Sequence, residues 1–330
     1  VEVNRNINPS DTNEVVGEYA RADEIQATEA IAAARGASET WKNVTIQERA
    51  DVLDRIGTEI LARREELGKL LSREEGKTLN EGIGETIRGG TIFKFFAGEA
   101  LRPSGEAIPS VRPGVEVEFS RAPGGVVGII TPWKFPIAIP AWKIAPALAY
   151  GNSVVFKPAD LTPAGGWVLA EIISRSGLPP GVFNLVMGSG SQVGETFANS
   201  SEVDAVSFTG SVPIGRHVRA AVAPRGAKIQ LEMGGKNPLI VLDDADLDTA
   251  VQAAVDGAYF QTGQRCTASE RLIVTEGIHD AFVSAVTERI KNLTVDNAIK
   301  EGTEMGPAVS QDQLDTDLEY MQIGKDEGAN

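Results

Sequence analysis

From residue 124 onward, short apolar runs alternate with helical segments, and this alternation is the feature that most limits how the chain can fold. The expected strands and helices, in chain order, are strands at 126–131, 153–157, 182–186, 205–208 and 228–232 and helices at 138–149, 162–176, 191–199 and 212–223. Repeated strand–helix units form parallel sheets with helices on both faces. The sequence therefore predicts an α/β fold with a doubly wound, mostly parallel sheet.

The segments before residue 124 predict helices and one hairpin. Apolar residues at helical spacing predict a helix over 22–35, a long amphipathic helix over 47–71 and a third helix that ends at about residue 100. Between Pro103 and Pro123 the pattern changes to turns and alternation, which predicts a half-buried strand or hairpin.

A second α/β region begins at about residue 235. Apolar runs at 238–242 and 271–274 predict two strands, and helical patterns cover 246–258, 278–292 and 311–325. A chain of 330 residues commonly folds into about two domains, which agrees with this division. In a doubly wound fold the ligand lies beyond the carboxyl ends of the strands. We therefore expect functional residues in the loops that follow the strands.

Composition excludes several classes of function. The chain has 31 basic and 46 acidic residues, a formal charge of −15, so its field repels nucleic acids and anionic membranes. Its apolar runs are too short to span a bilayer, and the N-terminal residues do not resemble a signal peptide. A single cysteine then indicates a reducing cytoplasm. No metal site is expected, because His217 and His279 have no Cys or His at ligand spacing.

Two loops have the pattern of a phosphate site. Gly188, Gly190 and Gly194 form a glycine-rich turn after a strand, although such glycines also simply close a strand-to-helix turn. The segment from Phe208 through Thr209 and Gly210 to Ser211 leads from a strand into a helix, whose free N–H groups attract anions. The alternative reading of Ser211 is an ordinary N-cap.

Lys157 lies at the end of an expected buried strand, with Asp160 three residues later. A buried ammonium needs an anionic or hydroxyl partner, so the pair could hold a nucleotide ribose. An acidic residue there disfavours a 2′-phosphate and so favours NAD over NADP. The alternative is a surface ion pair of little energetic weight.

Cys266 and Glu232 are the candidate catalytic residues. Cys266 is the one thiol of the chain and lies among glycine and small polar residues beside Arg265, which suits a nucleophile. The alternative is an inert buried cysteine. Glu232 ends an apolar strand, where desolvation of its carboxylate would suit a general base; the alternative is a turn cap.

Five segments, taken together and in this order, resemble the aldehyde dehydrogenase superfamily. The motifs are Thr131-Pro132-Trp133-x-Phe135-Pro136, Gly151-Asn152-x-Val154-Val155-x-Lys157-Pro158, Phe208-Thr209-Gly210-Ser211, Leu231-Glu232-Met233-Gly234-Gly235-Lys236 and Gly263-Gln264-x-Cys266. The flanking sequence is also similar, so the resemblance covers essentially the whole chain. It implies an NAD(P)-binding domain over 1–234, with the hairpin at about 103–123 used in oligomerisation, and a C-terminally incomplete catalytic domain over 235–330.

The resemblance also implies a role for each matching residue. Cys266 is the nucleophile that attacks an aldehyde, and Glu232 is the base that activates water against the resulting thioester. The implied cofactor is NAD, with NADP as the possible alternative. The implied cofactor-binding residues are Thr131, Pro132, Trp133, Lys157, Asp160, Gly190, Gly194, Phe208, Thr209, Gly210, Ser211 and Gly234.

Two features depart from the family pattern. Lys134 occupies the position of an asparagine that stabilises the oxyanion, and loss of such a donor typically lowers turnover by about two to three orders of magnitude. The chain also ends at Asn330, before the family's later motifs. We therefore expect a fragment with impaired activity.

Within the superfamily the chain looks most like the 2-oxoglutarate semialdehyde (2,5-dioxopentanoate) and succinate semialdehyde dehydrogenases. Trp142 stands where some of those enzymes have an arginine for an anionic substrate. The resemblance implies a cytoplasmic enzyme with a small-molecule aldehyde substrate, a homodimer or homotetramer when full length, with no nucleic-acid or membrane partner. The alternatives are an inactive NAD-binding remnant and a thiol esterase.

Overall fold

The computed structural model describes residues 2–329, which divide into two compact units. The first unit contains the described residues up to Asn4, together with Tyr19–Arg64 and Glu85–Glu232. The second contains Arg5–Glu18, Glu65–Gly84 and the described residues from Met233 onward. Both units are therefore discontinuous in sequence. The assignment of cofactor binding to 1–234 and of catalysis to 235–330 stays a prediction.

A five-stranded sheet forms the centre of the first unit and confirms the predicted fold class. Its strands, in spatial order, are β7 (Phe183–Leu185), β6 (Ser153–Lys157), β5 (Val126–Ile130), β8 (Ala205–Gly210) and β9 (Lys228–Met233). The β5–β6, β5–β8 and β6–β7 pairs are parallel. The β-branched residues in β5 and β6 favour strands, and these two strands are almost entirely buried, as the centre of a parallel sheet requires.

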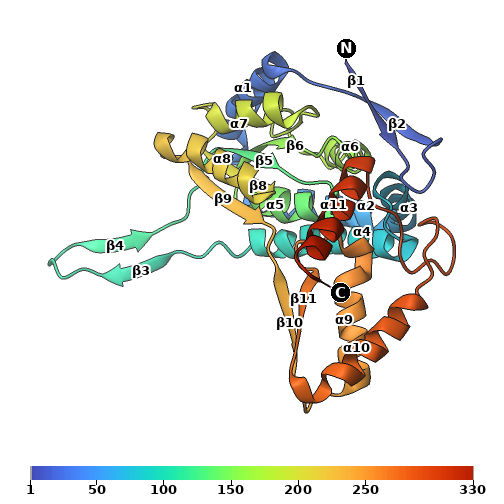
Figure 1. The fold of residues 1–330 in the computed structure, drawn as a ribbon. Helices are drawn as coiled ribbons and strands as arrows, with labels where there is room; N and C mark the ends of the chain where they lie inside the picture. The colour runs from blue at the N-terminus through green and yellow to red at the C-terminus, as the bar shows by residue number, and fades with distance from the viewer. Residues whose placement is uncertain (1, 330) are drawn as a thin grey trace. The chain divides into compact units, whose positions relative to one another are not determined.

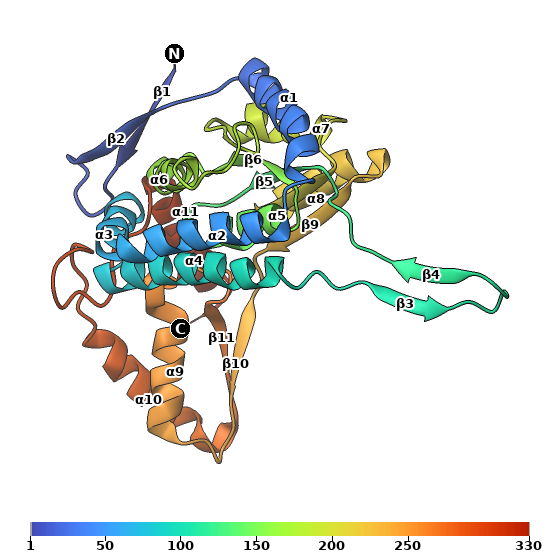
Figure 2. The ribbon, with the colours of Figure 1, turned by 180° about the vertical axis from the view of Figure 1, so that it is seen from behind.

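Helices cover both faces of this sheet. In Figures 1 and 2, α1 (Glu24–Trp41) and α7 (Glu195–Asn199) lie on one side of the strands, and α2 (Ile46–Ala62) and α5 (Ala138–Ala149) lie on the other. The first side also receives α8 (Val212–Val222), whose Val218 and Val222 join one apolar cluster with α1 and the sheet. The helix α6 (Pro163–Ser174) packs beside β7.

The prediction of one helix over 47–71 is wrong. The chain forms α2, which ends at Ala62, and α3 (Arg64–Glu75), with Arg63 between them at φ −99° and ψ 16°. No glycine or proline marks this break, so the helical period continues through it in the sequence. The predicted third helix is confirmed as α4 (Leu79–Ala100).

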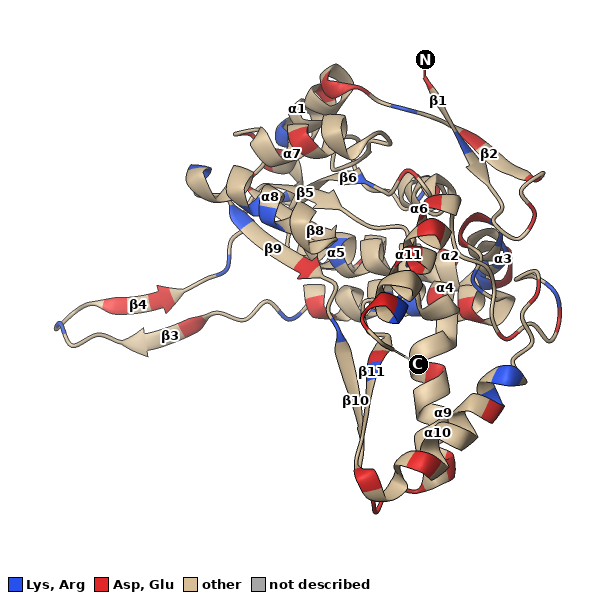
Figure 3. Cartoon of the chain, in the orientation of Figure 1, with Lys and Arg blue, Asp and Glu red and all other residues tan. Residues whose placement is uncertain are grey.

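The predicted hairpin is present and extends away from the sheet of its own unit (Figure 1). It consists of antiparallel β3 (Glu106–Pro109) and β4 (Glu116–Phe119). The expected half-burial is wrong, because Phe119 is 58% exposed and Ile108 is 44% exposed. Figure 3 shows acidic residues on β4, which are Glu116 and Glu118.

The second unit contains a parallel pair of strands, β10 (Asn237–Val241) and β11 (Ser269–Val274). Two helices, α9 (Leu247–Tyr259) and α10 (Glu276–Lys291), pack with them around Val241, Val255, Phe282 and Val286. The helix α11 (Gln311–Asp326) contributes no buried residue. Near the N-terminus, β1 (Val3–Ile7) pairs with β2 (Val15–Ala20). Among the described residues, no helix is both long enough and apolar enough to cross a bilayer.

Candidate functional site

Three candidate residues lie at one edge of the central sheet. Thr131, Lys157 and Ser211 each follow or end a strand, and the strands β5, β6 and β8 are parallel neighbours. The backbone N–H of Thr131 donates to the carbonyl of Lys157 at 3.1 Å, which holds these two loops together. The hydroxyl of Thr131 is buried and has no hydrogen-bond partner within the described chain. This edge therefore offers unused polar groups to a ligand.

The ammonium of Lys157 is almost fully buried, with 5% of the residue exposed. Its Nζ donates to the carbonyl of Pro158 at 2.9 Å and lies 3.8 Å from the Asp160 carboxylate, which also pairs with Arg21 at 3.2 Å. Burial lowers the pKa of Lys157, while Asp160 acts in the opposite direction. The Lys157–Asp160 ion pair expected from the sequence is thus present. The ammonium of Lys157 has three N–H donors, so it can still donate to an anion or a hydroxyl.

The glycine-rich turn lies beside Lys157. Residues Gly190–Gly194 form a single π-helical turn, in which the Ser189 hydroxyl accepts a bond from the N–H of Gln192 at 3.2 Å. A Cβ on Gly194 would lie 3.9 Å from Cδ of Lys157. The structure therefore brings Gly194 and Lys157 together, as a shared site requires.

Ser211 precedes α8 at the N-cap position, but its hydroxyl makes no capping hydrogen bond. Only its carbonyl is used, as the acceptor for the N–H of Gly215 at 2.9 Å. Ser211 thus occupies the N-cap position, as the alternative reading expected, but its side chain does not cap the helix. Its hydroxyl stays available at a helix terminus that carries partial positive charge.

The loop after β5 contains Trp133 and Lys134. The Nζ atom of Lys134 lies 5.8 Å from the centre of the Trp133 ring, within the range of a cation–π contact. The buried carboxylate of Glu85 holds the end of this loop, since it accepts from the N–H groups of Ile137 at 2.8 Å and Ala138 at 3.1 Å. The sequence pattern did not identify Glu85, because its partners lie more than fifty residues later.

Glu232 is the penultimate residue of β9 and is exposed, so the expected desolvation of its carboxylate is wrong. Its Oε1 accepts from Nε2 of Gln230 at 2.8 Å, and Oε1 of Gln230 accepts from Nζ of Lys143 at 2.9 Å. Nζ of Lys143 also donates to the Ser207 hydroxyl at 2.8 Å. Burial lowers the pKa of Lys143 to about 8, against the opposing effect of Glu232.

Lys143 is therefore a further candidate that the sequence analysis missed. The signal was a single lysine inside the apolar helical segment 138–149. Only 8% of the residue is exposed, so the hydrogen bonds to Ser207 and Gln230 are what make its burial tolerable.

Cys266 and Gly234 belong to the second unit, and Cys266 is a free, half-buried cysteine. Its carbonyl accepts from Nδ2 of Asn237 at 2.8 Å, and the same amide donates to the carbonyl of Ala268 at 3.0 Å. The backbone N–H of Cys266 has no acceptor among the described residues. A free N–H beside the thiol is what an oxyanion formed on that thiol would use.

The guanidinium of Arg265, next to Cys266 in the sequence, makes its hydrogen bonds to the end of α9. Its Nη2 donates to the carbonyls of Asp256 at 3.0 Å and Gly257 at 2.7 Å, and its guanidinium lies 4.9 Å from the Phe260 ring centre. Burial lowers the pKa of Arg265, which Glu81 and Cys266 partly oppose. Arg265 thus fastens the loop to the end of α9.

The turn before Cys266 has an unusual backbone. Gln261 (φ 53°), Thr262 (φ 57°) and Gly263 (φ 68°) are three consecutive residues in the left-handed region. For residues with a Cβ this conformation costs about 1–2 kcal/mol each, and it is rarest for β-branched residues such as threonine. Such strain persists only where surrounding contacts impose it, and it is concentrated at functional sites.

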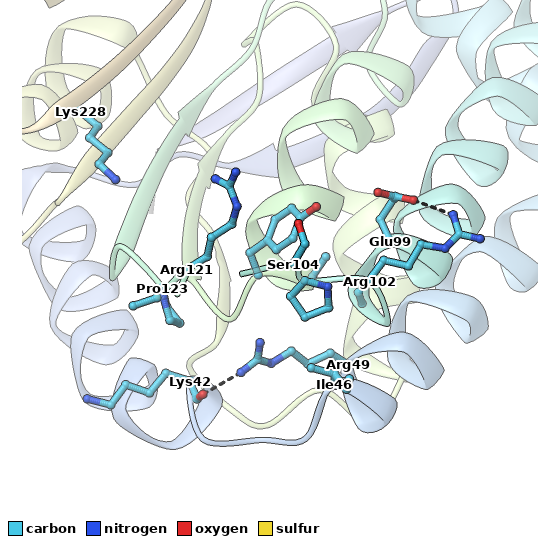
Figure 4. A pocket seen from close by; sticks show the side chains of 14 residues that line it. Lys42, Ile46, Arg49, Glu99, Arg102, Ser104, Arg121, Pro123 and Lys228 are labelled. Atoms are coloured by element: carbon cyan, nitrogen blue, oxygen red, sulfur yellow. Dashed lines mark hydrogen bonds and ion pairs between the residues drawn. The ribbon is translucent and has the colours of Figure 1, made fainter. Parts of the chain in front are cut away.

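A cavity of about 780 Å³ lies elsewhere in the first unit, near the base of the hairpin (Figure 4). Its charged lining consists of Lys42, Arg49, Glu99, Arg102, Arg121 and Lys228. Arg49 donates to the carbonyl of Lys42 at 2.7 Å at the end of α1, and Arg102 pairs with Glu99 at 2.9 Å. These contacts stabilise helix ends, and no candidate residue lines the cavity.

Among residues 2–329, no cluster of metal-ligating side chains is present.

Comparison with known proteins identifies close relatives. The model of the aldehyde dehydrogenase family matches residues 2–330. The chain is 45% identical to an alpha-ketoglutaric semialdehyde dehydrogenase of Bacillus subtilis and 41% identical to an alpha-ketoglutarate semialdehyde dehydrogenase of Haloferax volcanii, each over 98% of this chain. It spans 66% of the length of both relatives.

A crystal structure of betaine aldehyde dehydrogenase from Staphylococcus aureus in complex with NAD⁺ has a TM-score of 0.97 with this chain and 39% sequence identity. The match covers 99% of this chain and 65% of that one. The predicted fold and the predicted resemblance to semialdehyde dehydrogenases are confirmed by these matches.

Proposed function

The chain belongs to the aldehyde dehydrogenase family, and from this premise we propose that the protein oxidises an aldehyde to a carboxylic acid with NAD as the electron acceptor. The family match over residues 2–330 is the observation that carries the proposal. The unused polar groups at the sheet edge and the free thiol with its free N–H support it.

The residues at the sheet edge fit a dinucleotide. The buried Lys157, beside Asp160 and Gly194, suits ribose hydroxyls, and the uncapped Ser211 at the start of α8 suits the pyrophosphate. The remaining candidate contacts are Thr131, Pro132, Trp133, Gly190, Phe208, Thr209, Gly210 and Gly234. The acidic Asp160 favours NAD, although NADP is retained as an alternative acceptor.

The chemistry assigned to the chain has two stages. The Cys266 thiolate attacks the aldehyde carbon, and the oxygen of the resulting thiohemiacetal accepts a bond from the N–H of Cys266. The nicotinamide of bound NAD would supply the hydride acceptor for oxidation of this adduct to a thioester, while the sulfur of Cys266 would hold the acyl group. Glu232 then removes a proton from water, whose oxygen attacks the thioester to release the acid and restore the thiol.

Lys134 is assigned the position beside the developing oxyanion. An ammonium can donate a hydrogen bond, but unlike the rigid amide of asparagine it is a point charge on a flexible stem. Its Nζ lies 5.8 Å from the centre of the Trp133 ring. We expect turnover below that of an enzyme with asparagine at this position. Lys134→Asn should raise kcat by about two orders of magnitude, and Lys134→Met, which has no donor, should not. Equal kcat for wild type and Lys134→Asn would show that Lys134 does not limit the rate.

The substrate class follows from the relatives. Two relatives that match 98% of this chain, at 45% and 41% identity, are named as dehydrogenases of alpha-ketoglutarate (2-oxoglutarate) semialdehyde, so we assign this chain a dicarboxylic semialdehyde. The NAD-bound structural relative is named for betaine aldehyde, which has a cationic tail and provides the contrasting substrate.

The test measures NADH formation by the 330-residue chain with 2,5-dioxopentanoate, succinate semialdehyde and betaine aldehyde. We expect the wild-type chain to turn over the two anionic substrates, and we expect Cys266→Ser to abolish this turnover. Lys291→Ala, which removes an exposed lysine at the end of α10 in the second unit, is the control and should keep the turnover. NAD binding without turnover would instead support a catalytically inactive remnant, and ester hydrolysis without NAD would support a thiol esterase.

We also propose that the hairpin joins two copies of the chain. Its pairing places Ile108, Val117 and Phe119 on one face, and Ile108 and Phe119 are largely exposed. An exposed apolar face on a projecting hairpin is typical of an interface, and most soluble oligomers are symmetric dimers.

A further inference from the structure

Two buried carboxylates hold the left-handed turn that precedes Cys266. Oε1 of Glu81 accepts from the backbone N–H of Gln261 at 2.6 Å, and Oε1 of Glu75 accepts from its side-chain Nε2 at 2.7 Å. Gln261 is 1% exposed and Glu75 is fully buried. Both the main chain and the side chain of one strained residue are thus fixed by charged acceptors, which form the stronger class of hydrogen bond.

Each carboxylate is itself held in place. Glu75 lies 3.3 Å from the ammonium of Lys77, and neither side chain is exposed. The second oxygen of Glu81 accepts from the N–H of Thr78 at 2.7 Å, so Glu81 also closes the first turn of α4. Burying these charges is costly, and apolar residues would pack the same space at lower cost. Their arrangement is therefore better explained by the geometry that they impose on Gln261.

The far side of the turn is held by the segment that begins at Gly306. The hydroxyl of Thr262 donates to the carbonyl of Gly306 at 3.0 Å, and Oε1 of Gln264 accepts from the N–H of Val309 at 2.9 Å. A Cβ on Gly306 would lie 1.9 Å from the carbonyl oxygen of Gly76, so this close approach requires glycine. The turn is enclosed between residues 75–81 and 306–309.

Backbone hydrogen bonds connect the left-handed turn to Cys266 within a few residues. The carbonyl of Gln261 accepts from the N–H of Gln264 at 2.9 Å, and that of Gly263 accepts from the N–H of Arg265 at 2.8 Å. On the other side, Asn237 holds the carbonyl of Cys266. The left-handed turn therefore determines the direction in which the chain enters Cys266.

We propose that Glu75, Glu81 and Gln261 are positioning residues for Cys266: they keep residues 261–263 left-handed and so hold the thiol and the free N–H beside it in one arrangement. This inference rests on the proposed role of Cys266 as the nucleophile. The positioning itself is a property of the folded chain and can be measured without turnover.

The test uses Gln261→Met, which keeps the length of the side chain but removes its bond to Glu75. Because Cys266 is the one thiol of the chain, a bulky maleimide reports only on this loop. We expect the variant to react about tenfold faster, since access to a half-buried thiol depends on how often the loop opens. Amide hydrogen exchange over 260–268 should accelerate in parallel.

Two controls separate positioning from a general loss of stability. Gln252→Met makes the same chemical change on the exposed face of α9 and should react at the wild-type rate. Val286→Ala destabilises the core of the second unit without touching the turn and should change the rate by less than about twofold. A wild-type rate for Gln261→Met, or an equal increase in Val286→Ala, would overturn the proposal.

Glu81→Gln is the second variant, and it decides the question if Gln261→Met does not fold. An amide cannot replace both carboxylate acceptors at once, so one of the bonds to Thr78 and Gln261 is lost and maleimide labelling should again accelerate. The proposed function can fail separately: faster labelling in a protein that never forms NADH would leave the positioning role intact. Where NADH is formed, Gln261→Met should lower kcat and leave KM for NAD unchanged.

Discussion

Lys143 is an ionisable side chain that the first unit keeps almost entirely out of water. Its hydrogen bonds to Ser207 and Gln230 connect it to Glu232, yet burial still lowers its pKa to about 8. The folded protein therefore releases the Lys143 proton at a lower pH than the unfolded chain, whose lysine has the ordinary value of 10.5. This difference links folding to pH.

We predict a pH-dependent stability difference between wild type and Lys143→Met. Between pH 8 and 10.5 the unfolded chain binds the Lys143 proton and the folded protein does not, so the free energy of unfolding rises with pH through this window. Relative to Lys143→Met, wild type should gain about 2–3 kcal/mol from pH 7 to pH 10. Urea unfolding at both values measures the gain.

Gln252→Met, which changes an exposed side chain that carries no ionisable group, is the control for that experiment. Its stability difference from wild type should be the same at both pH values. A constant difference for Lys143→Met as well would contradict the assignment of the low pKa to Lys143.

Whether the role of a residue could be predicted from the sequence depended on how far away its contact partners lie in the chain. Lys157 and Ser211 were identified because Lys157 ends β6 and Ser211 directly follows β8, and the carboxyl ends of parallel strands in one sheet share one edge. Glu85 and Glu75 were missed, because their partners lie 52 and 186 residues away. No local pattern distinguishes such a buried glutamate from a solvated one.

Among the elements, the hairpin β3–β4 has the clearest consequence for assembly. Ile108 and Phe119 share its apolar face, whereas Ala107 lies on the other face. Replacing Ile108 and Phe119 together by lysine should convert the proposed oligomer to monomer, since buried lysines at an interface are costly. Sedimentation velocity measures the mass.

Ala107→Lys is the control, and it should leave the sedimenting mass unchanged. The folded unit should tolerate both changes, because the hairpin contributes no residue to the core of the sheet. A monomeric wild type, or an oligomer that persists in the double variant, would rule out this interface.

Helices and strands were predictable where the hydrophobic period and the turn residues that bound each segment agreed. The strands from β5 to β11 appear within two residues of the expected bounds, because each is a short run of continuous or alternating apolar residues between turn signals. The division between α2 and α3 was missed, because Arg63 interrupts the helix without a glycine or proline. The exposed hairpin was expected to be half-buried because alternation specifies an apolar face without specifying what covers it.

At the scale of the whole molecule, cofactor binding should stabilise the protein. NAD at about one hundred times its Kd should raise the free energy of unfolding by about 2.7 kcal/mol if only the folded chain binds it. Lys157→Ala should show a smaller gain at the same NAD concentration, and Lys291→Ala, which removes an exposed lysine, should match wild type. Thermal shift in the presence and absence of NAD measures these gains. Identical gains in all three proteins would exclude Lys157 from the site.

The discontinuous second unit has a consequence for synthesis on the ribosome. Glu75 is made 186 residues before Gln261, a delay of about 10–40 s at ordinary rates of translation. During that interval Glu75, Glu81 and Lys77 have emerged, but the turn that the two carboxylates hold does not yet exist. The first unit is complete at Glu232 and can fold earlier. Nascent chains should therefore acquire the central sheet first, and the thiol should stay reactive toward a bulky maleimide until residues 306–309 have emerged.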